Sequence, residues 1–256
     1  MKHLFYLIIG LSLIISGCAA PEKNTAFQTS TIDALLAGVY DGNMSCRDLL
    51  KHGDFGIGTF DHLDGEMVTL DGKIYQVKAD GKVYNPDMSL KTPFATICQF
   101  DADETILIKP GLDYDEFEKM LNEFAPNQNL FYAIKITGQF KSMKTRSVPA
   151  QHKPYPPLKE ITKNQPKFNM KNISGTIVGF RCPPYVKGIN VPGYHLHFIS
   201  SNRTQGGHIL NFEVADGKCE IDILNQFFLT LPVNDKEFAG TDLSLNRTKE
   251  LKAVEK

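Results

Sequence analysis

The sequence predicts a mixed α/β protein that is rich in sheet and folds as two packed sub-domains. Three Asp-Gly pairs between residues 64 and 81 separate short β-prone runs, a pattern typical of β-hairpins. Residues 113–124 have helical spacing, and residues 145–157 contain four prolines that exclude regular structure. We therefore expect an N-terminal mixed β-sheet with helices, residues 31–145, and a C-terminal antiparallel β part, residues 146–256.

The first residues have the pattern of a bacterial lipoprotein signal. A short basic start precedes an apolar run, residues 4–15, that is short for a membrane span. The run ends in Ile15-Ser-Gly-Cys18, where small residues precede a cysteine that can be lipidated. We expect a signal peptide (residues 1–17), a lipid anchor on Cys18 and a flexible tether (residues 18–30). The protein would then be exported and membrane-anchored at a periplasmic or extracellular face. The alternative is a plain secretory signal that happens to contain a cysteine.

The N-terminal part begins with short helices and continues with strands. Ser30 or Thr31 can cap a helix over residues 30–38, and a second short helix is expected over residues 45–52. From residue 55 the apolar period changes, which predicts a meander of three or four strands up to residue 84. Two more strands are expected over residues 92–100 and 105–108.

Residues 113–124 form the clearest predicted helix. Asp113 is a suitable N-cap and Glu116 completes a capping box. The apolar stripe is expected to lie in the core and consists of Phe117, Met120, Leu121 and Phe124. In the rest of the chain, strands are expected over residues 130–138, 172–180, 191–200, 208–214 and 218–231, and the end, residues 243–256, has a weak helical pattern.

Charge and cysteine content narrow the class of protein. The net charge is -1 and the isoelectric point is about 6.7, which argues against nucleic acid as the main partner. Besides Cys18, the chain has four cysteines, which allow three disulfide pairings in an exported protein. Their spacings match no zinc-ribbon pattern, and the cysteines are Cys46, Cys98, Cys182 and Cys219.

Three histidines within fourteen residues carry the strongest chemical signal. His195 and His197 are two residues apart, so on a strand their side chains point to the same face. Residues 201–207 read as a hairpin loop ending in two glycines, and the returning strand would bring His208 beside them. Three neutral imidazoles with an open fourth position are a ligand set for catalytic zinc or a related divalent ion.

The triad alone does not name a reaction. A hydrase, a hydrolase, a cupin oxygenase and a metal-carrying lipoprotein without catalysis all remain open at this point. A cupin would need a glutamate a few residues after the second histidine, whereas residues 199–203 contain no carboxylate.

The whole chain from about residue 31 resembles the α-acetolactate decarboxylase family. No single motif is specific, but the ordered set is. The motifs are Leu63-Asp-Gly-Glu-Met-Val-Thr-Leu-Asp-Gly-Lys-Ile-Tyr-Gln-Val77, Thr92-Pro-Phe-Ala95, Arg146-Ser-Val-Pro149, Lys153-Pro-Tyr-Pro-Pro157, Pro192-Gly-Tyr-His-Leu-His-Phe198 and Gly206-Gly-His208.

The resemblance implies decarboxylation of (S)-2-acetolactate to (R)-acetoin and carbon dioxide by a homodimer. It implies that the three histidines, His195, His197 and His208, hold Zn²⁺, although manganese and iron also accept imidazole ligands. It further implies active-site roles for Arg146 and Glu66 and for a glutamate of the C-terminal tail. Glu255 fits this last position best and Glu250 is the competitor. On local sequence alone, Glu66 is a solvated hairpin residue.

Overall fold

The computed structural model describes residues 22–255. The predicted signal peptide and the lipidation cysteine, Cys18, lie outside the described residues. The described part is a mixed α/β fold built on two large sheets, as the sequence predicts. None of its helices combines the length and the apolar character that a membrane span requires.

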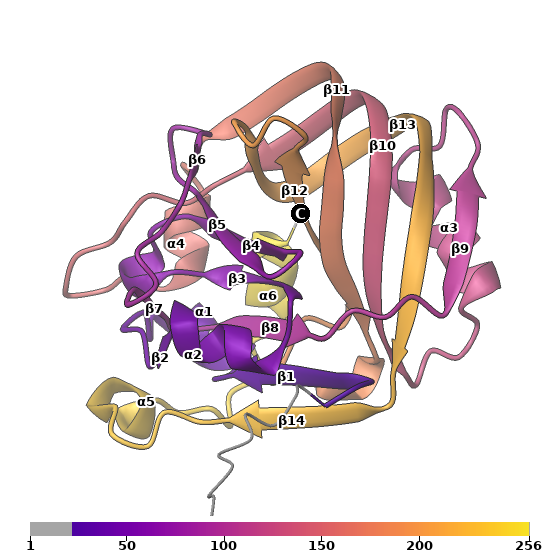
Figure 1. Cartoon of the computed structure of the whole chain (residues 1–256). Helices are drawn as coiled ribbons and strands as arrows, with labels where there is room; N and C mark the ends of the chain where they lie inside the picture. Colours follow the sequence, from indigo (N-terminus) through magenta and orange to yellow (C-terminus); the bar gives the residue numbers. More distant parts are fainter. Residues whose placement is uncertain (1–21, 256) are drawn as a thin grey trace, which may run out of the picture.

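The first large sheet has seven strands drawn mainly from the N-terminal half (Figure 1). Its outermost pair, β14 and β1, is parallel and the remaining pairs are antiparallel, so the sheet is mixed. In spatial order the strands are β14 (Gln226–Thr230), β1 (Thr25–Thr29), β8 (Ala95–Cys98), β3 (Phe55–Thr59), β4 (Glu66–Leu70), β5 (Lys73–Val77) and β6 (Val83–Tyr84).

The prediction of a flexible tether over residues 18–30 is wrong for residues 25–29. Residues Thr25–Thr29 form strand β1, and all five are buried. This strand pairs with β8 on one side and with β14, some 200 residues later, on the other. Its polar composition resembles a linker, and only the two distant partners make it a strand.

The second large sheet has five strands, and every pairing in it is antiparallel. Strand β10 pairs along its length with both β11 and β13, and β12 joins β11 to β13, so these four strands close on themselves. Figure 1 shows the long strands β10, β11 and β13 side by side. The strands are β10 (Phe131–Arg146), β11 (Lys167–Cys182), β12 (Gly193–Ser200), β13 (Gly206–Leu224) and β9 (Glu104–Ile108).

The expected division at residues 145 and 146 does not coincide with the division between the sheets. Strand β9 and nearly all of β10 precede it but belong to the second sheet, and β14 follows it but belongs to the first. Because the two sheets exchange strands, the proline-rich segment that follows β10 connects elements of one packed unit.

The helices mostly begin where the sequence predicts them. Thr31 caps α1 by accepting a hydrogen bond from the Ala34 amide, and Asp113 and Glu116 form the expected capping box of α3. The helices and short strands are α1 (Ile32–Ala37), β2 (Met44–Ser45), α2 (Cys46–Leu49), η1 (Leu50–His52), η2 (Asp61–Leu63), β7 (Lys91–Thr92), α3 (Tyr114–Phe124), α4 (Leu158–Thr162), η3 (Pro184–Val186), α5 (Lys236–Gly240) and α6 (Thr248–Val254).

The prediction that the apolar stripe of α3 lies in the core is wrong for its last residue, Phe124. Phe117 and Leu121 are fully buried against the second sheet, whereas the Phe124 side chain is 57% exposed. Phe124 is the last residue of the helix, where the chain turns away from the sheet.

The four cysteines are buried free thiols in the described part of the chain. None of the three possible disulfide pairings of these cysteines is therefore formed among residues 22–255. Cys98 lies inside β8 and packs in the apolar core.

One buried carboxylate gives a stability prediction. Asp222 on β13 is 1% exposed, and burial, opposed by a hydrogen bond from the Asp101 amide, raises its pKa to about 6. The pKa in the unfolded chain is about 3.9, so the folded state binds more protons between pH 4 and 6 and stability falls as the pH rises. We expect Asp222→Asn to raise the unfolding free energy by up to about 3 kcal/mol at pH 8. Urea denaturation at pH 8 and pH 4 checks this, because the gain should vanish at pH 4.

Candidate metal centre

The three predicted histidines come together in the structure. His195 and His197 lie on β12, and the register of the sheet places His208 of β13 directly opposite His197. The ring centroids are 5.1 to 5.4 Å apart. One nitrogen from each ring lies within 4.8 Å of the others, so the three can share one ion.

Burial holds all three imidazoles in the neutral form that binds metal. His195, His197 and His208 are at most 8% exposed. Burial, with Arg146 nearby, lowers the pKa of His195 to about 3, and burial lowers the pKa of His197 and His208 well below the usual value. A metal ligand has to be deprotonated, so these rings need no proton release to bind an ion near neutral pH.

The hydrogen bonds of the rings agree with a metal site. His197 Nδ1 donates to the Met67 carbonyl oxygen over 2.8 Å, which fixes the tautomer and leaves Nε2 with a lone pair. In the described part of the chain, neither His197 Nε2 nor His208 Nδ1 has a hydrogen-bond partner, although both are buried. Unpaired buried nitrogens are costly, and a divalent cation satisfies them. The donor set therefore fits the metal that the sequence implied.

Arg146 and Glu66 meet beside the histidines. Arg146 ends β10, and its Nη1 donates to Glu66 Oε1 over 2.8 Å. The other Glu66 oxygen, Oε2, lies 3.6 Å from His197 Nε2. Both side chains are about 95% buried, so the ion pair faces the histidines out of contact with water.

The local expectation of a solvated Glu66 is wrong. Glu66 follows an Asp-Gly turn, but β4 packs against β12 and the whole strand is buried. The structure places Glu66 near the histidines, as the family resemblance implied.

The C-terminal tail reaches the same cavity. Helix α6 leads into this tail and packs against α4. Arg146 Nη2 donates to the Val254 carbonyl oxygen over 3.2 Å, and Glu255 Oε2 lies 3.7 Å from His208 Nε2. The competitor, Glu250, instead forms an ion pair with Arg247 over 3.5 Å. Of the two tail glutamates, the structure brings Glu255 to the histidines.

The two glutamates of the cavity have similar protonation behaviour. Burial, opposed by the Arg146 charge, raises the pKa of Glu66 and of Glu255 to about 7 each. A carboxyl group with a pKa near neutrality can both accept and return a proton at the working pH.

Sequence reasoning missed the apolar wall of the cavity. This wall comes from α1, the turn before β4, the residue before β8, the proline-rich segment, α4 and α6, and its side chains are Ile32, Leu35, Leu63, Phe94, Val148, Leu158 and Val254. No local pattern distinguishes these residues from ordinary core residues. They surround a small space whose polar lining residues are Thr59, Glu66, Arg146, His195, His208 and Glu255.

Comparisons with known proteins agree with this geometry. Residues 26–245 match the family model described as alpha-acetolactate decarboxylase. The chain is 50% identical over 234 residues to the alpha-acetolactate decarboxylase of Methanosarcina mazei, covering 91% of this chain and 81% of the relative. It is 43% identical over 233 residues to that of Brevibacillus brevis, covering 91% and 81%.

A solved structure shows the same fold over nearly the whole chain. The crystal structure of alpha-acetolactate decarboxylase from Bacillus subtilis strain 168 superposes with a TM-score of 0.88 at 41% identity, covering 90% of this chain and 99% of that one. With the family model matching more than four fifths of the sequence, the chain belongs to the alpha-acetolactate decarboxylase family.

Proposed function

We propose that this chain removes carbon dioxide from (S)-2-acetolactate to give (R)-acetoin at the three-histidine centre, as a step of acetoin formation. The observation that carries the proposal is the convergence of Arg146 and Glu66 on the cavity of the histidines. A metal-carrying lipoprotein would need neither side chain there. A zinc hydrase or hydrolase is not favoured either, because the relatives over most of the chain are carboxy-lyases.

The reaction consumes one proton. The bond between the tertiary carbon and the carboxylate breaks, carbon dioxide leaves, and the electron pair passes to the neighbouring carbonyl group. A proton added to one face of a carbon atom then gives a single enantiomer of acetoin. When bound by His195, His197 and His208, a divalent cation would supply positive charge where this electron pair accumulates.

Arg146 is suited to bind the carboxylate that departs. Its two terminal nitrogens are engaged by Glu66 and the Val254 carbonyl, which fixes the plane of the guanidinium group. Its Nε is buried and has no partner among residues 22–255. This free donor, in a site of low dielectric constant, can hold an anionic substrate in one orientation.

Glu66 and Glu255 are suited to carry the proton. Glu66 reaches the cavity from β4 and lies near His197. Glu255 reaches it from the tail after α6 and lies near His208. Burial raises the pKa of both carboxyl groups, which favours the protonated form that can deliver a proton. If only one of the two glutamates delivers the proton, it reaches one face of the carbon atom, and this sets the configuration of acetoin.

We propose zinc as the resident ion, because three imidazoles with an open position suit it. Manganese and iron are the rivals. Metal analysis of the protein as isolated, followed by reconstitution with each ion, distinguishes them.

Incubation of the purified protein with racemic acetolactate tests the function. We expect acetoin to form from about half of the substrate, and a chelator followed by dialysis to abolish it. Restored acetoin formation after adding the divalent ion completes the test. Metal-dependent binding without any acetoin would instead support the metal-carrier alternative.

We also propose that the protein is exported and anchored by a lipid on Cys18, on the strength of the Ile15-Ser-Gly-Cys18 pattern. The protein would then act on acetolactate outside the cytoplasm. Labelling with a radioactive fatty acid checks this, because Cys18→Ser should abolish both the label and the recovery of the protein with membranes.

A homodimer is the assembly we propose, formed through β14. This strand lies at the end of the seven-stranded sheet, so one of its edges has no strand partner among residues 22–255. Apolar side chains on and after it are exposed: Phe228 is 55% and Val233 is 90% exposed. Sedimentation of Phe228→Lys should show monomers at concentrations where the unaltered protein is a dimer.

A further inference from the structure

The turn between β3 and β4 contains two consecutive residues in a strained backbone conformation. His62 has a φ angle of 59° and Leu63 has a φ angle of 60°. Both angles lie in the left-handed region, where a bulky side chain is an outlier. Strain of this kind persists only where the surrounding structure imposes it, and it is found most often at active sites and ligand sites. The strain therefore points to a function of this turn.

Hydrogen bonds hold the backbone of both strained residues in place. The His62 amide donates to the Tyr40 carbonyl oxygen over 2.9 Å, and the His62 carbonyl accepts from the Gln151 amide over 2.7 Å. The Leu63 amide donates to the Phe60 carbonyl oxygen over 2.9 Å, and the Leu63 carbonyl accepts from the amide two residues later over 2.8 Å. Two of these partners come from distant parts of the chain, so the tertiary structure imposes the conformation.

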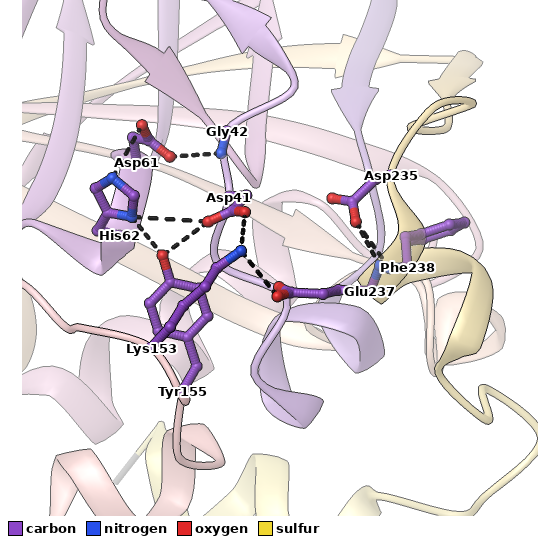
Figure 2. A network of polar contacts seen from close by, with 9 residues as sticks. All are labelled: Asp41, Gly42, Asp61, His62, Lys153, Tyr155, Asp235, Glu237 and Phe238. Atoms are coloured by element: carbon purple, nitrogen blue, oxygen red, sulfur yellow. Dashed lines mark hydrogen bonds and ion pairs between the residues drawn. The ribbon is translucent and has the colours of Figure 1, made fainter.

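The side chains that precede Leu63 tie the turn to its neighbours (Figure 2). The Gly42 amide donates to Asp61 Oδ1 over 2.6 Å. His62 Nδ1 contacts the hydroxyl group of Tyr155, which belongs to the proline-rich segment. The turn is thus held by the loop after α1 on one side and by the proline-rich segment on the other.

The side chain that this turn directs inward is that of Leu63. It is 2% exposed, and it lines the catalytic cavity together with Glu66, Arg146, His195 and His208. The residue also belongs to an apolar core cluster that includes side chains of α1, α4 and α6. Because a leucine side chain neither donates nor accepts a hydrogen bond, it can act on a substrate only through its shape.

We propose that Leu63 limits the size of the alkyl groups on the 2-acyl-2-hydroxy acid that the cavity accepts. This role rests on the proposed decarboxylase function. The polar groups of such a substrate face the histidines, Arg146 and the two glutamates, which leaves its alkyl groups to the apolar wall. Both alkyl groups of acetolactate are methyl groups. A leucine that is held rigidly against them excludes longer chains, because a packed wall does not yield to extra methylene groups.

Decarboxylation of longer homologues tests the role of Leu63. The substrates are racemic acetolactate and the two homologues in which a propyl group replaces one of its methyl groups. We expect Leu63→Ala to raise kcat/KM for at least one homologue, relative to kcat/KM for acetolactate, by about tenfold or more, since a single methylene group in an apolar pocket changes this ratio by about 10–200-fold. Leu63→Met nearly conserves the side-chain volume and should leave the ratio as it is in the unaltered protein.

Leu36→Ala is the matched control for a loss of core packing. Leu36 of α1 is fully buried in the same apolar cluster as Leu63 but is not among the described residues that line the cavity. The variant should lose stability and keep the ratio of the unaltered protein. Leu63→Gly is a second test variant, in case Leu63→Ala does not fold. Glycine adopts a φ angle of 60° without strain, and the same rise in the ratio is expected.

An unchanged ratio in folded Leu63→Ala and Leu63→Gly, with acetolactate still decarboxylated, would overturn the proposal. The strained turn would then serve only to place Glu66, and its variants would slow all three substrates alike. Failure of the unaltered protein to form acetoin at all is a different result, which would refute the proposed function itself.

Discussion

Replacing His197 by alanine is expected to remove the bound catalytic metal and acetoin formation together. His197 is the most buried of the three histidines, at 1% exposed, and the Met67 carbonyl fixes its orientation. Without it, two imidazoles remain and the ion loses a third of its protein ligands. Charge stabilisation by a metal is worth several kcal/mol. We therefore expect kcat/KM to fall by at least about a thousandfold, roughly 4 kcal/mol.

Two controls separate loss of metal from loss of fold. The His152→Ala variant changes an exposed histidine outside the centre and should keep full activity. Circular dichroism of His197→Ala should retain the sheet signal of the unaltered protein. A folded His197→Ala variant that still makes acetoin at the original rate would refute the assignment of this residue to the metal.

Replacing Arg146 by alanine is expected to abolish most activity while the metal stays bound. The guanidinium group is the only cation in contact with the cavity among the described residues that line it, and it is the candidate for holding the substrate carboxylate. Its loss also leaves Glu66 buried without its partner, which raises the pKa of Glu66 further. Removing one such charge-stabilising donor costs about 10²–10³ in rate, and we expect a fall in kcat/KM of that order or more.

Arg146→Lys is the matched variant for this prediction. It keeps the positive charge but cannot hold Glu66 and the Val254 carbonyl with two nitrogens of one plane. We expect activity between that of the unaltered protein and Arg146→Ala, with unchanged metal content in all three. Wild-type kcat/KM in Arg146→Ala would show that the substrate carboxylate is held elsewhere.

The features that the sequence predicts well are local. The caps at Thr31 and Asp113 act within three or four residues, and the structure contains both. The histidine cluster is also local, because a single hairpin brings His208 back to His197. In such cases the period of the side chains and the turn residues decide the geometry.

The features that the sequence does not predict depend on distant pairing. Strand β1 exists because β14 and β8 flank it, and nothing in residues 25–29 identifies those partners. Glu66 is buried because β4 packs on β12, about 130 residues later, whereas its local context is an exposed turn. Arg146 and Glu66 are 80 residues apart, and only the family resemblance linked them to the histidines before the structure did.

Titration of a divalent metal into metal-free protein, with acetoin followed at each step, tests the central claim most directly. We expect no acetoin without metal, a rise in rate as the three-histidine centre fills, and a plateau near one ion per chain. Acetoin formation at the full rate in metal-free protein would contradict it.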